Sequence, residues 1–272
     1  MNDSTLNDFR LDGKVAIVTG GSAWLGHDMA CAFAEAGSDV IITSRTQSRA
    51  EEATEGIADA YDVDTLALEM DQQEHEQVKT MAEDARAWKG HVDILVNNAG
   101  GGSGASEGNL FERAPEDMVD LIATNLTGAL FCCQEVGRFM VEQKHGKIIN
   151  IASMAGMVGR DRRMYRRNEK EEQPIDYAAS KAGVIGMTKD LAGLLSPQGV
   201  HVNAISPGGF DKGDLPDGFV EDYGDATMLG RMGRMGRMGK DLKGAALFLA
   251  SPASDYVTGH NLVVDGGFSV WK

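Results

Sequence analysis

The chain has 272 residues, of which 42% are hydrophobic and 25% are charged, and its formal net charge at pH 7 is −15. This length and composition are typical of a globular protein with a sizeable core and exclude a chain that is mainly disordered. The acidic excess disfavours binding to nucleic acid and to anionic membrane surfaces, because both require a basic face.

The N-terminal segment and the cysteines favour a cytoplasmic protein. The segment MNDSTLNDFRLDGK contains no apolar signal core, and no run is long and apolar enough to cross a bilayer. Cys31, Cys132 and Cys133 lack metal-ligand spacing and are expected to be reduced thiols. The six histidines are scattered along the chain, so we expect no metal site.

Short β-branched segments alternate with amphipathic helical segments. The expected strands are Lys14–Thr19, Asp39–Thr43, Thr65–Met70, Asp93–Val96, Lys147–Ile151, Val200–Ile205 and Asn261–Val264. The expected helices are Trp24–Ala36, Gln47–Ala60, His75–Trp88, Pro115–Gln143, Asp176–Leu195 and Leu242–Ala250. Continuous apolar strands separated by helices predict a doubly wound, Rossmann-type α/β fold with a parallel sheet covered by helices on both faces. Because no linker divides the chain, we expect residues 1–272 to form a single domain.

Two segments interrupt this alternation. Met157–Pro174 is polar and highly charged, and Gly208–Gly239 is long and rich in glycine. Both follow strands at the edge where doubly wound sheets bind ligands, so we expect loop insertions that serve as lids or binding loops.

A glycine-rich turn, Thr19–Gly26, follows the first expected strand. Such a turn before an apolar helix lets backbone N–H groups face a pyrophosphate, although a simple tight turn is the alternative. It resembles the T-G-x-x-x-G-x-G turn of the short-chain dehydrogenase/reductase family, with Trp24 in the position of the middle glycine. A side chain there must point away from the pyrophosphate or reshape the turn, unless Gly21 restores the lost freedom. The residues expected to contact a dinucleotide here are Gly20, Ser22, Trp24 and Leu25.

The end of the second expected strand favours NADP(H), with NAD(H) as the alternative. A carboxylate there would bind the ribose hydroxyls of NAD, but this chain has Ser44 and Arg45, which suit a 2′-phosphate. Asp71, after the third strand, matches the family residue near the adenine, although a helix N-cap fits it equally well. After the fourth strand, the family's cofactor-lining motif is matched by Asn98, Ala99 and Gly100.

Tyr177 and Lys181 stand one helical turn apart on one face of an expected helix. A nearby ammonium would lower the pKa of the tyrosine, which could then exchange a proton with a substrate oxygen. Because such pairs arise by chance, the prediction depends on Ser153, after the fifth strand, and Asn125, inside a long helix. These four residues match the family's catalytic tetrad, in which the tyrosine and lysine also contact the cofactor. The family's nicotinamide-binding segment is matched by Pro207, Gly208 and Phe210, but Lys212 replaces its usual threonine.

The resemblance covers residues 13–268 and implies hydride transfer between the nicotinamide and a carbonyl or secondary alcohol. The segments Ser206–Phe210 and Val264–Trp271 are similar to those of the gluconate 5-dehydrogenase-like branch, which implies a sugar, sugar acid or polyol substrate. One alternative is reduction of a 3-oxoacyl-carrier-protein. Another is a dinucleotide-binding sensor with weak or no catalysis, which Trp24 and Lys212 favour. RNA binding through the Gly-Arg-Met repeats fits the acidic chain poorly.

Five arginines in the first insertion are open to two interpretations. One or two of them could meet an anionic substrate, or all could pair with Glu169, Glu171 and Glu172 in a solvated loop. They are Arg160, Arg162, Arg163, Arg166 and Arg167. The family resemblance also implies a homo-oligomer, a tetramer or dimer, formed through the two long helices, whose small residues permit close approach. Packing within the domain would explain these small residues equally well.

Overall fold

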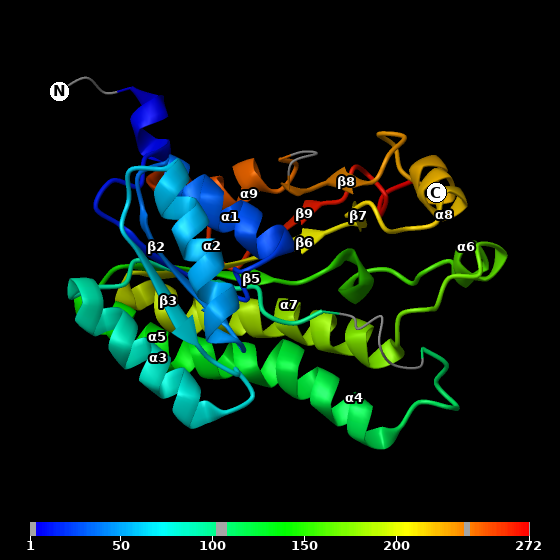
Figure 1. The fold of residues 1–272 in the computed structure, drawn as a ribbon, viewed down its shortest axis with the longest axis horizontal. Coiled ribbons are helices and arrows are strands. Elements are labelled where there is room, and N and C mark those ends of the chain that lie inside the picture. Colours follow the sequence, from blue (N-terminus) through cyan, green and yellow to red (C-terminus); the bar gives the residue numbers. More distant parts are fainter. Residues whose placement is uncertain (1–3, 102–107, 237–239, 272) are drawn as a thin grey trace.

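In the computed structural model, which describes residues 4–101, 108–236 and 240–271, parallel strands form a seven-stranded sheet in the order β3-β2-β1-β4-β5-β6-β9 (Figure 1). The order reverses beside β1, so the sheet is doubly wound, as the sequence predicts. The strands are β1 (Val15–Thr19), β2 (Asp39–Ser44), β3 (Thr65–Glu69), β4 (Ile94–Asn97), β5 (Gly146–Ile151), β6 (Val200–Pro207) and β9 (Asn261–Val264).

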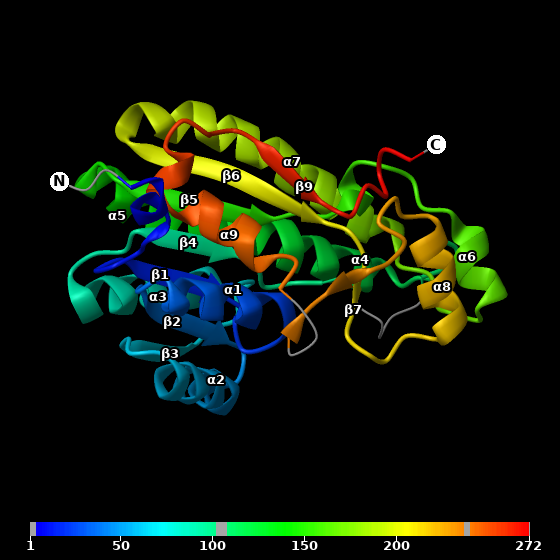
Figure 2. The ribbon, with the colours of Figure 1, turned by 90° about the horizontal axis from the view of Figure 1, so that it is seen from above.

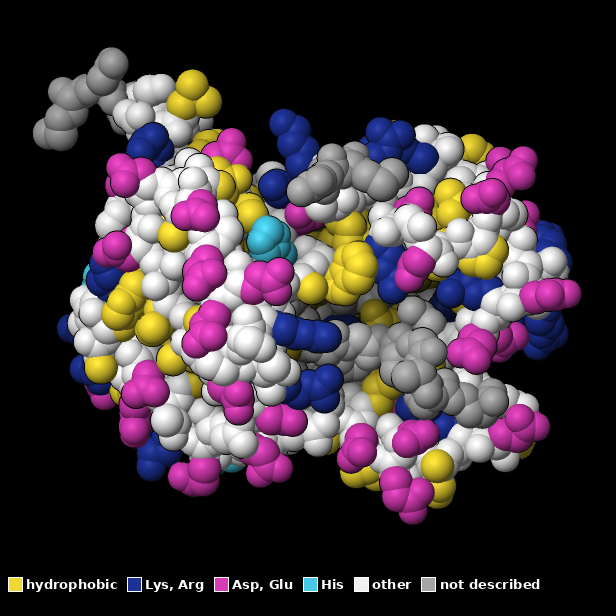
Figure 3. All heavy atoms as spheres, viewed as in Figure 1, with side chains coloured by type: hydrophobic (Ala, Val, Ile, Leu, Met, Phe, Trp, Pro, Cys, Tyr) yellow, Lys and Arg dark blue, Asp and Glu magenta, His cyan; other side chains and the backbone are white. Residues whose placement is uncertain are grey.

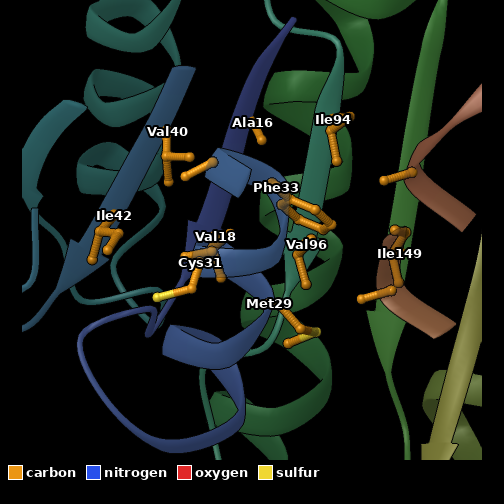
Figure 4. Close-up of a cluster of buried hydrophobic side chains, with 14 of the residues drawn as sticks. Ala16, Val18, Met29, Cys31, Phe33, Val40, Ile42, Ile94, Val96 and Ile149 are labelled. Atoms are coloured by element: carbon orange, nitrogen blue, oxygen red, sulfur yellow. The ribbon is translucent and has the colours of Figure 1, made fainter. Parts of the chain in front are cut away.

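Helices cover both faces of the sheet (Figures 1 and 2). One face carries α1 (Trp24–Glu35), α2 (Gln47–Ala60) and α9 (Lys243–Ala250). The other carries α3 (His75–Lys89), α4 (Pro115–Ile122), α5 (Gly128–Gln143) and α7 (Ile175–Leu195). Right-handed crossovers require this arrangement, and they explain why β1 is apolar and buried along its whole length. Figure 4 shows part of the core on the α1 face, where Phe33 and Met29 meet side chains of β1, β4 and β5.

The predicted helix Pro115–Gln143 is interrupted, which corrects the sequence expectation. A π turn, Ala123–Thr127, separates α4 from α5 and contains Asn125. A π turn inserts an extra residue into the helical ladder and is frequent at functional sites. Periodicity could not locate it, because helical φ and ψ angles continue through the turn. The other predicted helices and strands differ from the structure by one or two residues at their ends.

Both insertions contain regular structure that the sequence analysis described as loops. The first contains α6 (Arg162–Arg167), and the second contains β7 (Phe210–Asp211), α8 (Asp217–Asp225) and β8 (Gly233–Arg234). Helices α6 and α8 pack against each other through Met164, Phe219 and Tyr223, and Asp222 accepts hydrogen bonds from Arg167 and Asn168. We call these two helices the α6–α8 cap. It follows β5 and β6 in the chain and lies at the end of the molecule opposite the N-terminus (Figure 2).

Short 3-10 turns complete the described structure, at Thr5–Phe9, Met154–Gly156, Ser196–Gln198 and Pro252–Ser254. No described helix is both long enough and apolar enough to cross a membrane. Over the same described residues, no group of three or more His, Cys, Asp or Glu side chains is placed to hold a metal ion.

Candidate active site

A cleft of about 700 Å³ opens at the carboxyl ends of β1 to β4. Figure 3 shows this face hollowed near its middle, with Lys and Arg side chains at the rim of the hollow. The predicted dinucleotide-binding residues that line the cleft are Gly20, Ser22, Trp24, Leu25, Ser44, Arg45, Asp71, Asn98, Ala99 and Gly100. The structure therefore brings together residues from four strand ends, although their roles in binding stay predictions.

The glycine turn lies against the Asn98–Gly100 segment too closely for larger residues. Gly20 has a φ of +60°, and a Cβ there would lie 2.9 Å from the Cα of Ala99. The Thr19 hydroxyl accepts hydrogen bonds from the backbone N–H groups of Asn98 and Ala99, each at 3.0 Å. These contacts leave a backbone-walled cradle before α1, which is the kind of surface that fits a pyrophosphate.

Trp24 has a backbone conformation that glycine adopts more readily than other residues. Its φ is +52°, in the left-handed region, and its side chain is 57% exposed at the cleft. Gly21 does not take over this role, because its φ is not positive. A Cβ at Gly21 would lie 3.0 Å from the carbonyl oxygen of Val18. The Lys212 ammonium lies 5.0 Å from the centre of the Trp24 ring. The two departures from the family pattern thus contact each other as a cation–π pair.

The end of β2 presents two guanidinium groups to the cleft. Arg45 and Arg49 both line it, and Arg49 lies in the first turn of α2, four residues after Arg45. Glu69 lies beside Ser44 in the sheet, but its carboxylate accepts a hydrogen bond from the backbone of Gln47 and does not line the cleft. Sequence analysis missed Arg49, and its spacing from Arg45 was the signal available.

Asp71 closes a turn and does not cap a helix. Its carboxylate accepts a hydrogen bond from the backbone N–H of Gln73 at 3.0 Å, whereas the N-cap of α3 is Glu74. Gln72, which the sequence analysis did not single out, also lines the cleft. Its amide donates to the carbonyls of Ala99 and Thr124, and it thereby joins the ends of β3 and β4 to the π turn.

Ser153, Tyr177 and Lys181 meet at the carboxyl end of β5. The Lys181 ammonium donates a 2.7 Å hydrogen bond to the carbonyl of Ile151, and it lies 5.9 Å from the centre of the Tyr177 ring. Ser153 begins the 3-10 turn after β5, and its hydroxyl accepts a hydrogen bond from Ala155 while also bonding Tyr177. Ser153 therefore caps this turn and bonds Tyr177 at the same time.

Asn125 connects this group to the dinucleotide cleft. Its carboxamide oxygen accepts a hydrogen bond from the backbone of Gly101 at 2.8 Å, and its amide donates to the Gly101 carbonyl at 3.0 Å. The same amide lies 3.4 Å from the hydroxyl of Ser180, which stands between Tyr177 and Lys181 on α7. The π turn is what directs this polar side chain toward both neighbours.

Burial has the largest effect on the pKa values of Tyr177 and Lys181. It raises the pKa of Tyr177, against which a hydrogen bond from Ser153 and the charge of Arg160 act to lower it. Burial also lowers the pKa of Lys181 to about 8. The sequence analysis expected Lys181 to lower the pKa of Tyr177. The cation that has this effect is instead Arg160, which comes from a segment whose path the sequence could not give.

Five predicted cofactor residues lie outside the large cleft: Tyr177, Lys181, Pro207, Gly208 and Phe210. Gly208 follows β6, and a Cβ there would lie 2.8 Å from the Cα of Asp265 in the neighbouring chain segment. Phe210 lines a separate, smaller pocket of about 140 Å³ together with Arg231 and Asp241. The predicted nicotinamide contacts Pro207, Gly208 and Phe210 therefore do not line the main cleft.

Comparison with known proteins gives consistent relatives along the whole chain. The family described as enoyl-(acyl carrier protein) reductase matches residues 22–269. The 3-oxoacyl-(acyl-carrier-protein) reductase of Aquifex aeolicus is 34% identical over 265 residues, which are 96% of this chain and 99% of that one.

Solved structures of similar proteins have the same overall fold. A short-chain type dehydrogenase/reductase from Mycobacterium marinum matches with a TM-score of 0.86 and 33% identity over 98% of this chain and 99% of that one. A gluconate 5-dehydrogenase from Burkholderia cenocepacia, in complex with NADP and tartrate, matches with a TM-score of 0.85, 33% identity and the same coverage of both chains.

Proposed function

The chain belongs to the short-chain dehydrogenase/reductase family, oxidoreductases of carbonyl and CH–OH groups that use NAD(H) or NADP(H), and we propose that this member uses NADP(H) with Tyr177 as its general acid and base. Residues 1–272 then form one dinucleotide-binding and catalytic domain that includes both insertions. The observation that carries the proposal is the meeting of Ser153, Tyr177 and Lys181 at the end of β5. Asn125 links this group to the cleft.

The cleft fits a dinucleotide that carries a 2′-phosphate. The glycine turn would hold the pyrophosphate with backbone N–H groups, and Arg45 and Arg49 would hold the 2′-phosphate at the end of β2. When bound, the nicotinamide supplies or accepts the hydride. The Burkholderia cenocepacia gluconate 5-dehydrogenase, whose structure contains NADP, supports the choice of NADP(H) over NAD(H).

Tyr177 has suitable surroundings for proton transfer to a substrate oxygen. In the reductive direction its phenol would donate a proton to the carbonyl oxygen, and in the oxidative direction its phenolate would accept the hydroxyl proton. Ser153 would hold the same oxygen and stabilise the charge that develops on it. The hydrogen bond from Ser153 and the charge of Arg160 favour the phenolate against the effect of burial.

Lys181 and Asn125 would support this proton transfer indirectly. A pKa of about 8 lets Lys181 gain and lose a proton near physiological pH, so it can return protons to the Tyr177 region and hold the nicotinamide ribose. Asn125 fixes the backbone at Gly101 and reaches Ser180, and it thereby sets the distance between α7 and the cleft.

The proposed substrate is a sugar, sugar acid or polyol. The similarity to a gluconate 5-dehydrogenase along nearly the whole chain supports this class. Carbonyl reduction of a 3-oxoacyl-carrier-protein is the second candidate, because the Aquifex aeolicus reductase of that substrate is similar over nearly its whole length. A catalytically weak sensor is the third, and it would bind NADPH without turning over either class.

A screen of ketoses, sugar acids, polyols and 3-oxoacyl thioesters with NADPH, NADH and their oxidised forms tests the reaction. Tyr177→Phe should lower kcat by about 100-fold or more, because it removes the proton donor, and should leave the Kd for NADPH unchanged. Tyr256→Phe is the control, since that side chain is fully exposed. Equal turnover by Tyr177→Phe and the wild-type enzyme would overturn the mechanism.

The cofactor choice has its own test. Arg45→Ala should raise the Kd for NADPH more than the Kd for NADH, because only NADPH carries the phosphate that Arg45 is proposed to bind. An equal change for both cofactors would contradict the choice of NADP(H). A cytoplasmic location and a homo-oligomeric assembly, dimer or tetramer, complete the proposal.

A further inference from the structure

One arginine of the first insertion differs from the others in its partners. Within the described part of the chain, four of the five arginines form ion pairs with carboxylates. These pairs are Arg162 and Arg166 with Glu172, Arg163 with Asp161, and Arg167 with Asp222. Only Arg162 and Arg166 pair with one of the three glutamates expected from the sequence, whereas Arg163 and Arg167 pair with aspartates. Arg160 forms no such pair with any described residue.

The partners of Arg160 are neutral and place it beside the catalytic helix. One guanidinium nitrogen donates a 2.7 Å hydrogen bond to the side-chain oxygen of Gln173, and another donates a 3.0 Å bond to the carbonyl of Pro174. These two residues directly precede α7, whose first turn contains Tyr177. The contacts fix the guanidinium in place without cancelling its charge.

Arg160 lies near the phenols of both Tyr177 and Tyr165. Its charge lowers the pKa of each tyrosine, and partial burial lowers the pKa of the guanidinium itself. A weakly hydrated guanidinium in a partly buried site binds a carboxylate more strongly than an exposed one does, because less water screens the pair. In a protein of net charge −15, such a local cation favours the binding of an anion at this place.

We propose that Arg160 is a specificity-determining residue that binds a carboxylate of the substrate beside Tyr177. The enzyme then acts on hydroxy acids and keto acids in preference to neutral polyols and ketoses of the same chain length. This inference rests on the proposed function, since it takes Tyr177 as the group that meets the reacting oxygen. The α6–α8 cap, whose first helix begins two residues after Arg160, would cover the same compartment.

Matched substrate pairs test the inference. D-gluconate and D-glucitol with NADP⁺, and 5-keto-D-gluconate and L-sorbose with NADPH, differ at a carboxylate and share the rest of a six-carbon chain. The quantity measured is the ratio of kcat/KM for the acid to kcat/KM for its neutral partner. Arg160→Met should lower this ratio by about 10- to 100-fold, the loss expected for a charge-assisted hydrogen-bonded pair. Most of the loss should lie in KM for the acid.

Two further variants separate recognition from structure. Arg160→Gln keeps an N–H donor for the Pro174 carbonyl but loses the charge, so it should lower the ratio as Arg160→Met does. Arg163→Met is the matched control, because Arg163 is exposed and paired with Asp161, and it should leave the ratio unchanged. Circular dichroism and the Kd for NADPH show whether each variant is folded.

The outcomes distinguish the inference from the proposed function. The role of Arg160 would be overturned if the wild-type enzyme preferred the neutral member of each pair. It would also be overturned if the Arg160 variants lowered kcat/KM equally for both members. Either result would leave the oxidoreductase proposal intact. Wild-type enzyme that binds NADPH but turns over no member of the broader screen would overturn the proposed function, and the inference with it.

Discussion

At the residue scale, the two positions that depart from the family pattern, Trp24 and Lys212, contact each other. Trp24 takes a left-handed backbone conformation that costs a non-glycine residue roughly 1–2 kcal/mol. Its exposed ring lies under the Lys212 ammonium, a contact of about 0.5–1 kcal/mol at an exposed site. The pair joins the glycine turn to the segment after β7, on either side of the proposed cofactor site. These departures therefore fit a modified dinucleotide site and are weak evidence for a sensor without catalysis.

Lys181 provides a prediction about stability and pH. Its folded-state pKa of about 8 lies below its ordinary value of 10.5, so the charged form is disfavoured by folding. Below pH 8 the lysine is protonated in both states and destabilises the fold by about 3 kcal/mol, from 1.36 kcal/mol per pKa unit. Between pH 8 and 10.5 the unfolded chain binds more protons, so the free energy of unfolding gains this amount as the pH rises.

Lys181→Met should remove that gain. Urea unfolding of the cofactor-free protein from pH 7 to pH 10 measures the free energy of unfolding of wild type and variant. The difference between the two should move steadily in favour of wild type as the pH rises. The lost hydrogen bond to Ile151 adds an offset that does not change this slope. Lys189→Met, at an exposed position of the same helix, is the control with a flat difference. A flat difference for Lys181→Met would contradict the pKa shift.

At the element scale, α7 is held at its first turn by a buried ion pair. The Arg113 guanidinium lies 2.7 Å from the Asp176 carboxylate, and their side chains are 1% and 7% exposed. Asp176 directly precedes Tyr177, whereas Arg113 lies just before α4 and lines the cleft. The pair thus fixes the start of α7 against the segment before α4. At the other end of α4, the π turn performs a similar task through Asn125.

Asp176→Ala should destabilise the protein by roughly 3–5 kcal/mol, because it leaves a buried guanidinium without its carboxylate. Urea unfolding at pH 7 measures this cost. The matched control is Glu142→Ala, which breaks an exposed pair with Arg86 and should cost no more than about 1 kcal/mol. Similar costs for the two variants would show that the Arg113 pair does not anchor α7. A decrease in kcat of folded Asp176→Ala would show that the anchor also positions Tyr177.

At the scale of the whole molecule, the small residues of the long helices serve contacts within the chain. A Cβ at Gly183 would lie 2.7 Å from the side chain of Leu126, and a Cβ at Gly128 would lie 2.8 Å from the carbonyl of Gln72. The close approach that we expected between subunits is thus used inside the protomer. Large apolar side chains nevertheless stay exposed on these helices, at Val119 on α4, Leu130 on α5 and Leu194 on α7.

A homo-oligomer formed through these helices should dissociate when a charge is placed among the exposed apolar residues. Leu130→Asp is expected to lower the molar mass measured by size-exclusion chromatography with light scattering, because an interfacial carboxylate must be buried without a partner. Leu6→Asp, at an exposed leucine of the N-terminal turn, should leave the mass unchanged. A monomeric wild-type protein would contradict the predicted assembly.

The sequence by itself determined the doubly wound sheet and its elements. Strand and helix periodicities are local, so they fixed β1 to β9 in the main sheet and most helix ends to within two residues. The motifs also predicted strand ends that line the cleft, from Gly20 to Gly100. These signals can be read from the sequence alone because each depends on neighbouring residues or on the order of elements along the chain.

Only the tertiary structure decided what depends on contacts between distant segments. It showed that Arg49 joins Arg45, that Lys212 meets Trp24 and that the two insertions form a cap. It also replaced Lys181 by Arg160 as the cation that acts on the proton affinity of Tyr177. Electrostatic effects fall with distance through space and depend on burial, and spacing along the chain gives neither for a loop residue such as Arg160.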